Sequence, residues 1–199
     1  IGGDSYAIDA LGNTVSFVCG SFQPTLFKSI DNGTTWESRV IQPISNPLYS
    51  GDTLELLDSV ASTDEAYELL IDHQGVTHVW YGRNIILDDS IAKGWSYFPW
   101  ALGIMYWNEN MVGPPVLIEE TVIGDDDGDG TVTLFDNNNV IPSIYFSNGV
   151  SMSNAGIDAN GNIYLTYSSI VENTSHTGDN TGLHYRNLFV TVTKDGGKT

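Results

Sequence analysis

One acidic stretch, Gly124 to Asp136 (GDDDGDGTVTLFD), has the residue types and the spacing that bind a divalent cation. Alternate acidic side chains on a short glycine-containing loop converge on one point, where a hard cation such as Ca²⁺ finds several oxygen ligands. At positions 1, 3, 5, 7 and 12 of a calcium loop stand Asp125, Asp127, Asp129, the carbonyl of Thr131, and Asp136. Gly130 takes the turning position 6. The stretch therefore predicts a calcium site.

The residues beside this loop, TVIG and TVTLF, are typical of β-strands rather than of the helices of an EF-hand. We therefore expect a calcium loop between strands. Asp136 replaces the usual bidentate glutamate, and Thr133 occupies a position that is often acidic, so the expected affinity is reduced. The alternative is an acidic loop that only faces water.

Other reactive residue types are better explained as structural. The four histidines, His73, His78, His176 and His184, show no close metal-ligand spacing, and Cys19 is the single cysteine, predicted to be a small buried side chain. Aromatic residues gather between Gly94 and Trp107 and could stack on sugars, although packing between sheets is the simpler interpretation. They are Trp95, Tyr97, Phe98, Trp100, Tyr106 and Trp107.

Composition limits the partners. With 7 Lys plus Arg against 25 Asp plus Glu, the formal net charge is -18, so phosphate backbones and anionic membrane surfaces are repelled and nucleic acid is not expected to bind. No apolar run approaches the roughly 18 residues of a membrane-spanning helix. The excess of acidic residues suits a soluble protein that is exposed to divalent cations.

A motif Ile-Asp-x-x-Gly recurs three times, led by Asp9, Asp72 and Asp158. Each copy joins a strand through a two-residue turn to a second strand rich in β-branched and aromatic residues, which predicts three hairpins of one design. When the three copies are aligned on their aspartates, Ser16, Val79 and Leu165 occupy the same position. Neither face of these strands is consistently polar, as expected for sheets packed on both sides.

Each hairpin is followed by another strand-like run: TLFKSID, ALGIMYWNEN and NLFVTVTKD. Fourth strands are predicted at 36–41 and 116–123, which gives four-stranded units repeated around an axis. We expect long loops at 42–63, 124–153 and 171–182. Helix is scarce, although residues 64–70 could form one helical turn.

Between two of these runs lies the turn Ser29 to Trp36, SIDNGTTW. Its turn-forming residues and hydroxyls can bond to its own backbone, and Trp36 supplies an apolar body to bury. The fixed positions Ser29, Asp31, Gly33, Thr35 and Trp36 resemble the Asp-box, or BNR repeat, of sialidase-like β-propellers. The end of the chain fits the same spacing at Thr193, Asp195, Gly197 and Thr199. In the resembling families these boxes are structural braces at the blade periphery.

The resemblance implies an all-β fold, a partial β-propeller of four-stranded antiparallel blades. The whole chain, 1–199, is expected to be part of one propeller domain, with about three blade-like units near 5–43, 66–123 and 154–199 and an insertion at 124–153. Because the second box stops before its tryptophan, and no signal peptide precedes the first strand-like run, we expect a piece of a longer protein whose remaining blades come from the same polypeptide.

Resemblance to sialidases also implies an arginine triad, yet Arg39, Arg83 and Arg186 lie outside the Arg-Ile-Pro setting of that family and are better explained as strand-end residues. A glycosidase using paired carboxylates stays open, since 25 acidic residues offer no unique pair. The prediction is therefore a secreted or cell-surface binding or adhesion module, with a glycan or a surface protein as partner and a structural calcium ion. The alternatives are a glycoside hydrolase and a structural component of a surface assembly.

Overall fold

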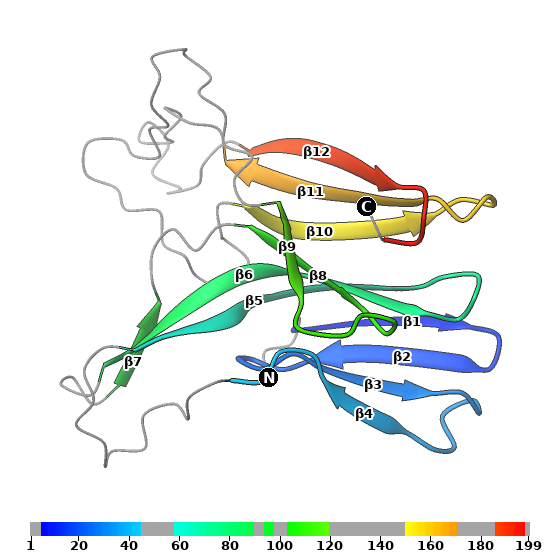
Figure 1. The fold of residues 1–199 in the computed structure, drawn as a ribbon, viewed down its shortest axis with the longest axis horizontal. Coiled ribbons are helices and arrows are strands. Elements are labelled where there is room, and N and C mark those ends of the chain that lie inside the picture. Colours follow the sequence, from blue (N-terminus) through cyan, green and yellow to red (C-terminus); the bar gives the residue numbers. More distant parts are fainter. Residues whose placement is uncertain are drawn as a thin grey trace, which may run out of the picture.

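The chain forms antiparallel β-sheets stacked face to face (Figure 1). The structure, a computed structural model, describes residues 5–44, 58–89, 94–97, 103–119, 150–170 and 186–197. Within these ranges there are strands and turns but no helix, and no helix that could cross a membrane is present in them.

The described strands form three sheets. The first sheet contains, in spatial order, β1 (Tyr6–Leu11), β2 (Thr14–Cys19), β3 (Thr25–Ser29) and β4 (Glu37–Val40). The second contains β5 (Asp58–Ile71), β6 (Thr77–Asp89), β8 (Ile104–Asn108) and β9 (Val116–Glu119), with β7 (Gly94–Tyr97) paired to the far end of β6. The third contains β10 (Val150–Ile157), β11 (Ile163–Ile170) and β12 (Arg186–Thr193).

The sheets share one design, in which consecutive strands pair along the sheet, except that β7 pairs only with β6, and the first strands of the sheets lie together. β5 contacts β1 on one side and β10 on the other (Figure 1). This arrangement confirms the predicted fold class, all-β with blade-like antiparallel sheets. The third and fourth strands predicted after the hairpins are confirmed by β3, β8 and β12 and by β4 and β9.

Two expectations about the start of the second sheet were wrong. Residues 64–70 form no helical turn, because they belong to β5, which begins at Asp58 inside the predicted loop. The helix-like signal coincides with a β-bulge: the register of β5 on β6 shifts between Thr63 and Tyr67, and Glu65 has a φ of 67°. Asp64 braces the bulge, since its carboxylate accepts the N–H groups of Ala66 and Gly82 at 3.0 and 2.9 Å.

The second and third hairpins share the predicted aspartate turn. The Oδ1 atom of Asp72 accepts the N–H groups of Gln74 and Val76 at 2.9 and 2.8 Å. Asp158 accepts those of Asn160 and Asn162 at 2.8 and 2.9 Å in the same way. Because each carboxylate satisfies two backbone donors, the aspartate determines the shape of the turn.

The predicted two-residue turn is present in the first hairpin, whereas five residues, 72–76 and 158–162, separate the paired strands of the second and third, where the prediction was wrong. β1 continues past Asp9, and Leu11 pairs directly with Thr14 across the two-residue turn at 12–13. The shorter turn displaces β2 by one residue relative to the other copies, so Ser16 and Val18 face the second sheet, whereas the aligned Val79 and Tyr81 face the first. The alignment on the aspartates therefore places Ser16 and Val79 at equivalent positions although their side chains lie on opposite faces of their sheets. A shift of one residue along a strand moves every side chain to the other face.

Two apolar cores hold the sheets together. Val18 and Leu26 pack against Tyr67, Leu69, Val79, Tyr81 and Trp107 between the first two sheets. Between the second and third sheets, Trp80, Ile104 and Tyr106 pack against Val150, Ile163, Leu165 and Tyr167. Tyr106 and Trp107 are neighbours on β8 and point into opposite cores, as predicted for aromatic residues packed between sheets.

His78 is buried and hydrogen-bonded on both ring nitrogens. Its Nε2 lies 3.2 Å from Asp72 Oδ2, and its Nδ1 lies 2.7 Å from the Tyr106 hydroxyl. Since the carboxylate can only accept, Nε2 carries the proton and Nδ1 accepts from Tyr106, whose oxygen accepts from Asn108 at 2.8 Å. Burial lowers the pKa of His78, against the opposing effects of Asp72 and Glu109, and so favours the neutral ring. Cys19, predicted to be buried, is half-buried.

Candidate functional site

The turn after β3 is held by its own side chains. Ser29 Oγ donates to Asp31 Oδ1 at 2.8 Å and accepts the N–H of Gly33 at 2.8 Å. The Asp31 carboxylate also accepts the N–H and the hydroxyl of Thr35 at 2.8 and 2.7 Å, and Trp36 Nε1 donates to the Gly33 carbonyl at 3.0 Å. These bonds, first those from Thr35, lower the pKa of Asp31 to about 2. All five predicted positions meet in this turn.

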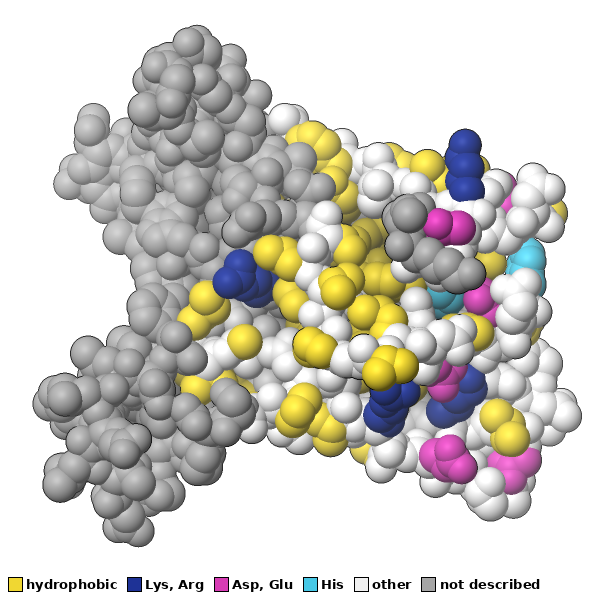
Figure 2. Space-filling view, in the orientation of Figure 1, with side chains coloured by type: hydrophobic (Ala, Val, Ile, Leu, Met, Phe, Trp, Pro, Cys, Tyr) yellow, Lys and Arg dark blue, Asp and Glu magenta, His cyan; other side chains and the backbone are white. Residues whose placement is uncertain are grey.

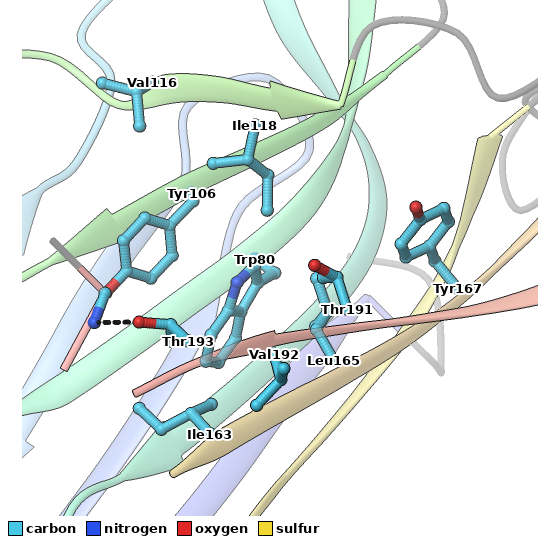
Figure 3. Close-up of a pocket in the computed structure, with 11 residues that line it drawn as sticks. Trp80, Tyr106, Val116, Ile118, Ile163, Leu165, Tyr167, Thr191, Val192 and Thr193 are labelled. Atoms are coloured by element: carbon cyan, nitrogen blue, oxygen red, sulfur yellow. Dashed lines mark hydrogen bonds between the residues drawn. The ribbon is translucent and has the colours of Figure 1, made fainter. Parts of the chain in front are cut away.

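The turn after β12 repeats part of this network. Thr193 Oγ1 donates to Asp195 Oδ1 at 2.7 Å. It also accepts the N–H of Gly197 at 3.0 Å, the bond drawn as a dashed line in Figure 3. A Cβ on Gly197 would overlap the Tyr106 hydroxyl, so glycine is required for the contact of this turn with β8. Thr199 lies outside the described residues.

The predicted calcium ligands Asp125, Asp127, Asp129, Thr131 and Asp136 also lie outside the described residues. Among the residues that the structure describes, no group of three or more His, Cys, Asp or Glu side chains is placed to hold a metal ion.

The three arginines lie in three different sheets. Arg39 on β4 donates to the carbonyls of Glu109 and Met111 at 3.2 and 3.4 Å, and its guanidinium lies 4.7 Å from the centre of the Trp107 ring. Arg186 at the start of β12 donates to the hydroxyl and the carbonyl of Ser168 at 2.9 and 3.2 Å. Arg83 lies on β6.

A groove of about 330 Å³ separates the second sheet from the third (Figure 3). The buried rings of Trp80, Tyr106 and Tyr167 line it together with exposed Thr191 and half-buried Thr193. Aliphatic side chains complete the lining: Val116, Ile118, Ile163, Leu165 and Val192. Figure 2 shows hydrophobic side chains gathered at the centre of the face seen in Figure 1. The lining residues come from β6, β8, β9, β11 and β12, so no local sequence pattern could have revealed the groove.

Two carboxylates join the first strands of adjacent sheets. Asp9 on β1 accepts the N–H of Ile71 on β5 at 2.8 Å, and Glu68 on β5 accepts the N–H of Ala155 on β10 at 3.0 Å. Burial raises the pKa of Glu68 to about 7; the bond from Ala155 opposes this shift and the negative charge of Asp9 adds to it. Among 25 acidic residues, the sequence does not distinguish this pair.

No family model and no curated protein sequence matches the chain. Among solved structures, the chain is similar to a D158A mutant of Cellvibrio cellulosa alpha-L-arabinanase, with 11% identity, a TM-score of 0.29, and coverage of 96% of this chain and 70% of the arabinanase. A similarity of this strength assigns neither fold nor function, so both rest on the contacts described above.

Replacing Glu68 with glutamine should change how stability depends on pH. The native pKa of about 7 lies above the reference value of 4.5, so the native state holds the proton more tightly and stability falls as pH rises from about 4.5 to 7. Because Glu68 is partly exposed, the expected loss is of order 1 kcal/mol. Glu68→Gln keeps an acceptor for Ala155 and should be more stable than the native protein at pH 8 but not at pH 4.

Urea unfolding at pH 4, 6 and 8 measures this difference. Glu37→Gln, at an exposed carboxylate of β4, is the matched control and should follow the native protein throughout. If the stability of the Glu68→Gln variant depends on pH as that of the native protein does, the raised pKa of Glu68 is contradicted.

Proposed function

We propose that this chain is a binding module of a secreted or cell-surface Asp-box β-propeller, and that its ligand is a glycan bound in the groove between the second and third sheets. The observation that carries the proposal is the groove itself. Its volume of about 330 Å³ falls in the range of small-molecule sites, which are mostly apolar with a few placed polar groups.

The lining suits a sugar ring, which has apolar C–H faces and polar hydroxyls at its rim. Trp80 and Tyr167 supply aromatic surface, and both carry a polar group as well. Thr191 offers a hydroxyl from β12. No lining residue among those described is Asp or Glu, so the groove supports binding rather than acid-base chemistry.

The two braced turns support the assignment to the Asp-box class. In the first, Ser29, Asp31 and Thr35 bond to one another and to the backbone, and in the second Thr193, Asp195 and Gly197 repeat the core of that network. Each turn lies at the end of the third strand of its sheet. They act as structural braces in this proposal, and the cation of the acidic stretch is a structural calcium ion.

A glycoside hydrolase is the second candidate, favoured by the carboxylates of the inner strands. Glu68, with a pKa of about 7, is suited to act as a general acid near neutral pH, and Asp9 is the acidic neighbour whose charge raises that pKa. Both carboxylates also accept backbone N–H groups, which equally fits a purely structural role.

Filling the groove should abolish glycan binding. Thr191→Trp places a large side chain at an exposed groove position without disturbing the core, so affinity for a glycan retained by the native protein should fall at least tenfold. A glycan array identifies a glycan that the native protein binds, and calorimetry then measures its affinity for the native protein and for each variant. Glu37→Trp, an exposed strand position far from the groove, should bind as the native protein does. Unchanged affinity in Thr191→Trp would remove the groove as the site.

Calcium should bind with measurable heat. Titration of the folded protein in a calorimeter should give a signal that Asp127→Ala and Asp129→Ala each reduce strongly, because each substitution removes one of the proposed oxygen ligands. Asp158→Ala, in a turn outside the acidic stretch, is the control. Absent heat, or heat equal in all variants, contradicts the calcium proposal.

Hydrolysis separates the two candidate functions. The binding module should release no reducing sugar from a panel of oligo- and polysaccharides. If sugar is released, Glu68→Gln and Asp9→Asn should each reduce the rate at least a hundredfold, while Glu37→Gln should leave it unchanged. Release that depends on Glu68 would replace the binding proposal with the hydrolase.

A further inference from the structure

His78 lies between the hairpin turn of Asp72 and the groove. The side chain is 1% exposed, and its ring stacks on those of Trp80 and Tyr106, with ring centres 5.9 and 6.0 Å apart. Both of these rings line the groove. His78 is therefore a buried titratable group packed against the wall of the proposed binding site.

With a neutral His78 ring, the Tyr106 hydroxyl donates to Nδ1 of His78. The two atoms are 2.7 Å apart, and the oxygen of the same hydroxyl accepts from Asn108 Nδ2 at 2.8 Å. On the other side of the ring, Nε2 donates to Asp72 at 3.2 Å. The Tyr106 proton is thus held by His78 and is directed away from the groove.

Protonation of His78 changes the role of Tyr106. An imidazolium has two N–H donors and no acceptor, so Nδ1 can then only donate. The Tyr106 oxygen accepts from His78 and from Asn108 in that state, which fills its acceptor positions, and its own proton must turn away from the imidazole. The hydroxyl then has a proton to offer outside this network.

The turned hydroxyl faces the turn after β12. Gly197 of this turn lies so close to the Tyr106 oxygen that a Cβ would overlap it, and both residues line the groove (Figure 3). Burial raises the pKa of Tyr106, and the negative charges of Asp72 and Asp195 add to this shift. An O–H group that leaves His78 is therefore attracted toward Asp195 and the groove, where a sugar hydroxyl can accept it.

The groups around His78 decide when it takes up a proton. Burial lowers the pKa of His78, while the bond to Asp72 and the negative charges of Asp72 and Glu109 raise it. Glu109 follows β8 and is paired with Lys28 of β3. The shift is downward overall, so the imidazole takes up its proton in acidic solution, below the ordinary value of 6.5.

We propose that His78 is a pH-sensitive switch of the groove: when the ring gains a proton, the Tyr106 hydroxyl turns from His78 to the groove and donates to the bound glycan. Binding then strengthens in acidic solution. The inference rests on the proposed function, because it concerns the regulation of the same groove. By linkage, a glycan that accepts the Tyr106 proton also makes His78 easier to protonate.

Proton NMR of the free protein tests the switch without any glycan. The ring resonances of Tyr106 should shift with the same midpoint as the imidazole resonance of His78, at a pH below 6.5. The imidazole of His78 is identified by its loss in His78→Gln, and in that variant the shift of Tyr106 should disappear. If His78 does not titrate in the folded protein between pH 8 and 5, or if Tyr106 does not follow it, the switch is absent.

Calorimetry with the oligosaccharide that the native protein retains from the glycan array tests the effect on binding. Affinity should be about fivefold higher at pH 5 than at pH 7.5, as expected of one added hydrogen bond. His78→Gln can donate to Asp72 and accept from Tyr106 at either pH, so it should lack this gain. His73→Gln, at an exposed position of the same turn, is the matched control and should keep it. Glu68 also titrates in this range but is present in all three proteins, so its effect cancels.

The two measurements separate the switch from the glycan site. Equal affinity at the two pH values, or a gain that persists in His78→Gln, contradicts the switch and leaves the glycan site standing. Coupled titration in a protein that binds no glycan supports the link between His78 and Tyr106 and overturns the proposed function. Circular dichroism checks folding. If His78→Gln unfolds, Tyr106→Phe, which keeps the ring and removes the hydroxyl, takes its place and should likewise lose the gain at pH 5.

Discussion

Two hydrogen bonds between carboxylates and backbone N–H groups hold the sheets together at their first strands. Asp9 binds the N–H of Ile71, and Glu68 binds that of Ala155, so each junction uses an acidic side chain of one sheet and the backbone of the next. The apolar cores alone are compatible with some sliding of one sheet over another, since burial is non-directional. These directional bonds, together with those at the first junction from Arg39 to the carbonyls of Glu109 and Met111 and between Ser16 and Thr77, fix the relative position, and the groove and the braced turns depend on that position.

Tyr106 shows how closely the parts depend on one another. Its ring packs in the core between the second and third sheets, and its hydroxyl closes the network of His78 and Asn108. The same residue lines the groove and contacts Gly197 in the turn after β12. A change at this one side chain therefore reaches the hairpin turn of Asp72, the groove and the second braced turn. The shape of the groove and the packing of the third sheet are physically linked through Tyr106.

Local features were predicted well. The turn from Ser29 to Trp36 and the aspartate turns at Asp72 and Asp158 each bond to themselves within a few residues, so their spacing in the sequence already contains the interaction. β-Branched and aromatic composition likewise predicted most of the described strands. The failures were also local in origin: a two-residue turn reversed the orientation of β2, and a bulge at Glu65 in β5 imitated a helical turn.

The sequence by itself determined the all-β class, the repeated hairpins, the braced turns and the acidic character, because each depends on residues that are neighbours in the chain. Tertiary structure alone decided which of 25 acidic residues meet at the inner strands and which aromatic residues border the groove. Those features join residues from strands far apart in the chain. Their positions follow from the stacking of whole sheets, which no short-range spacing encodes.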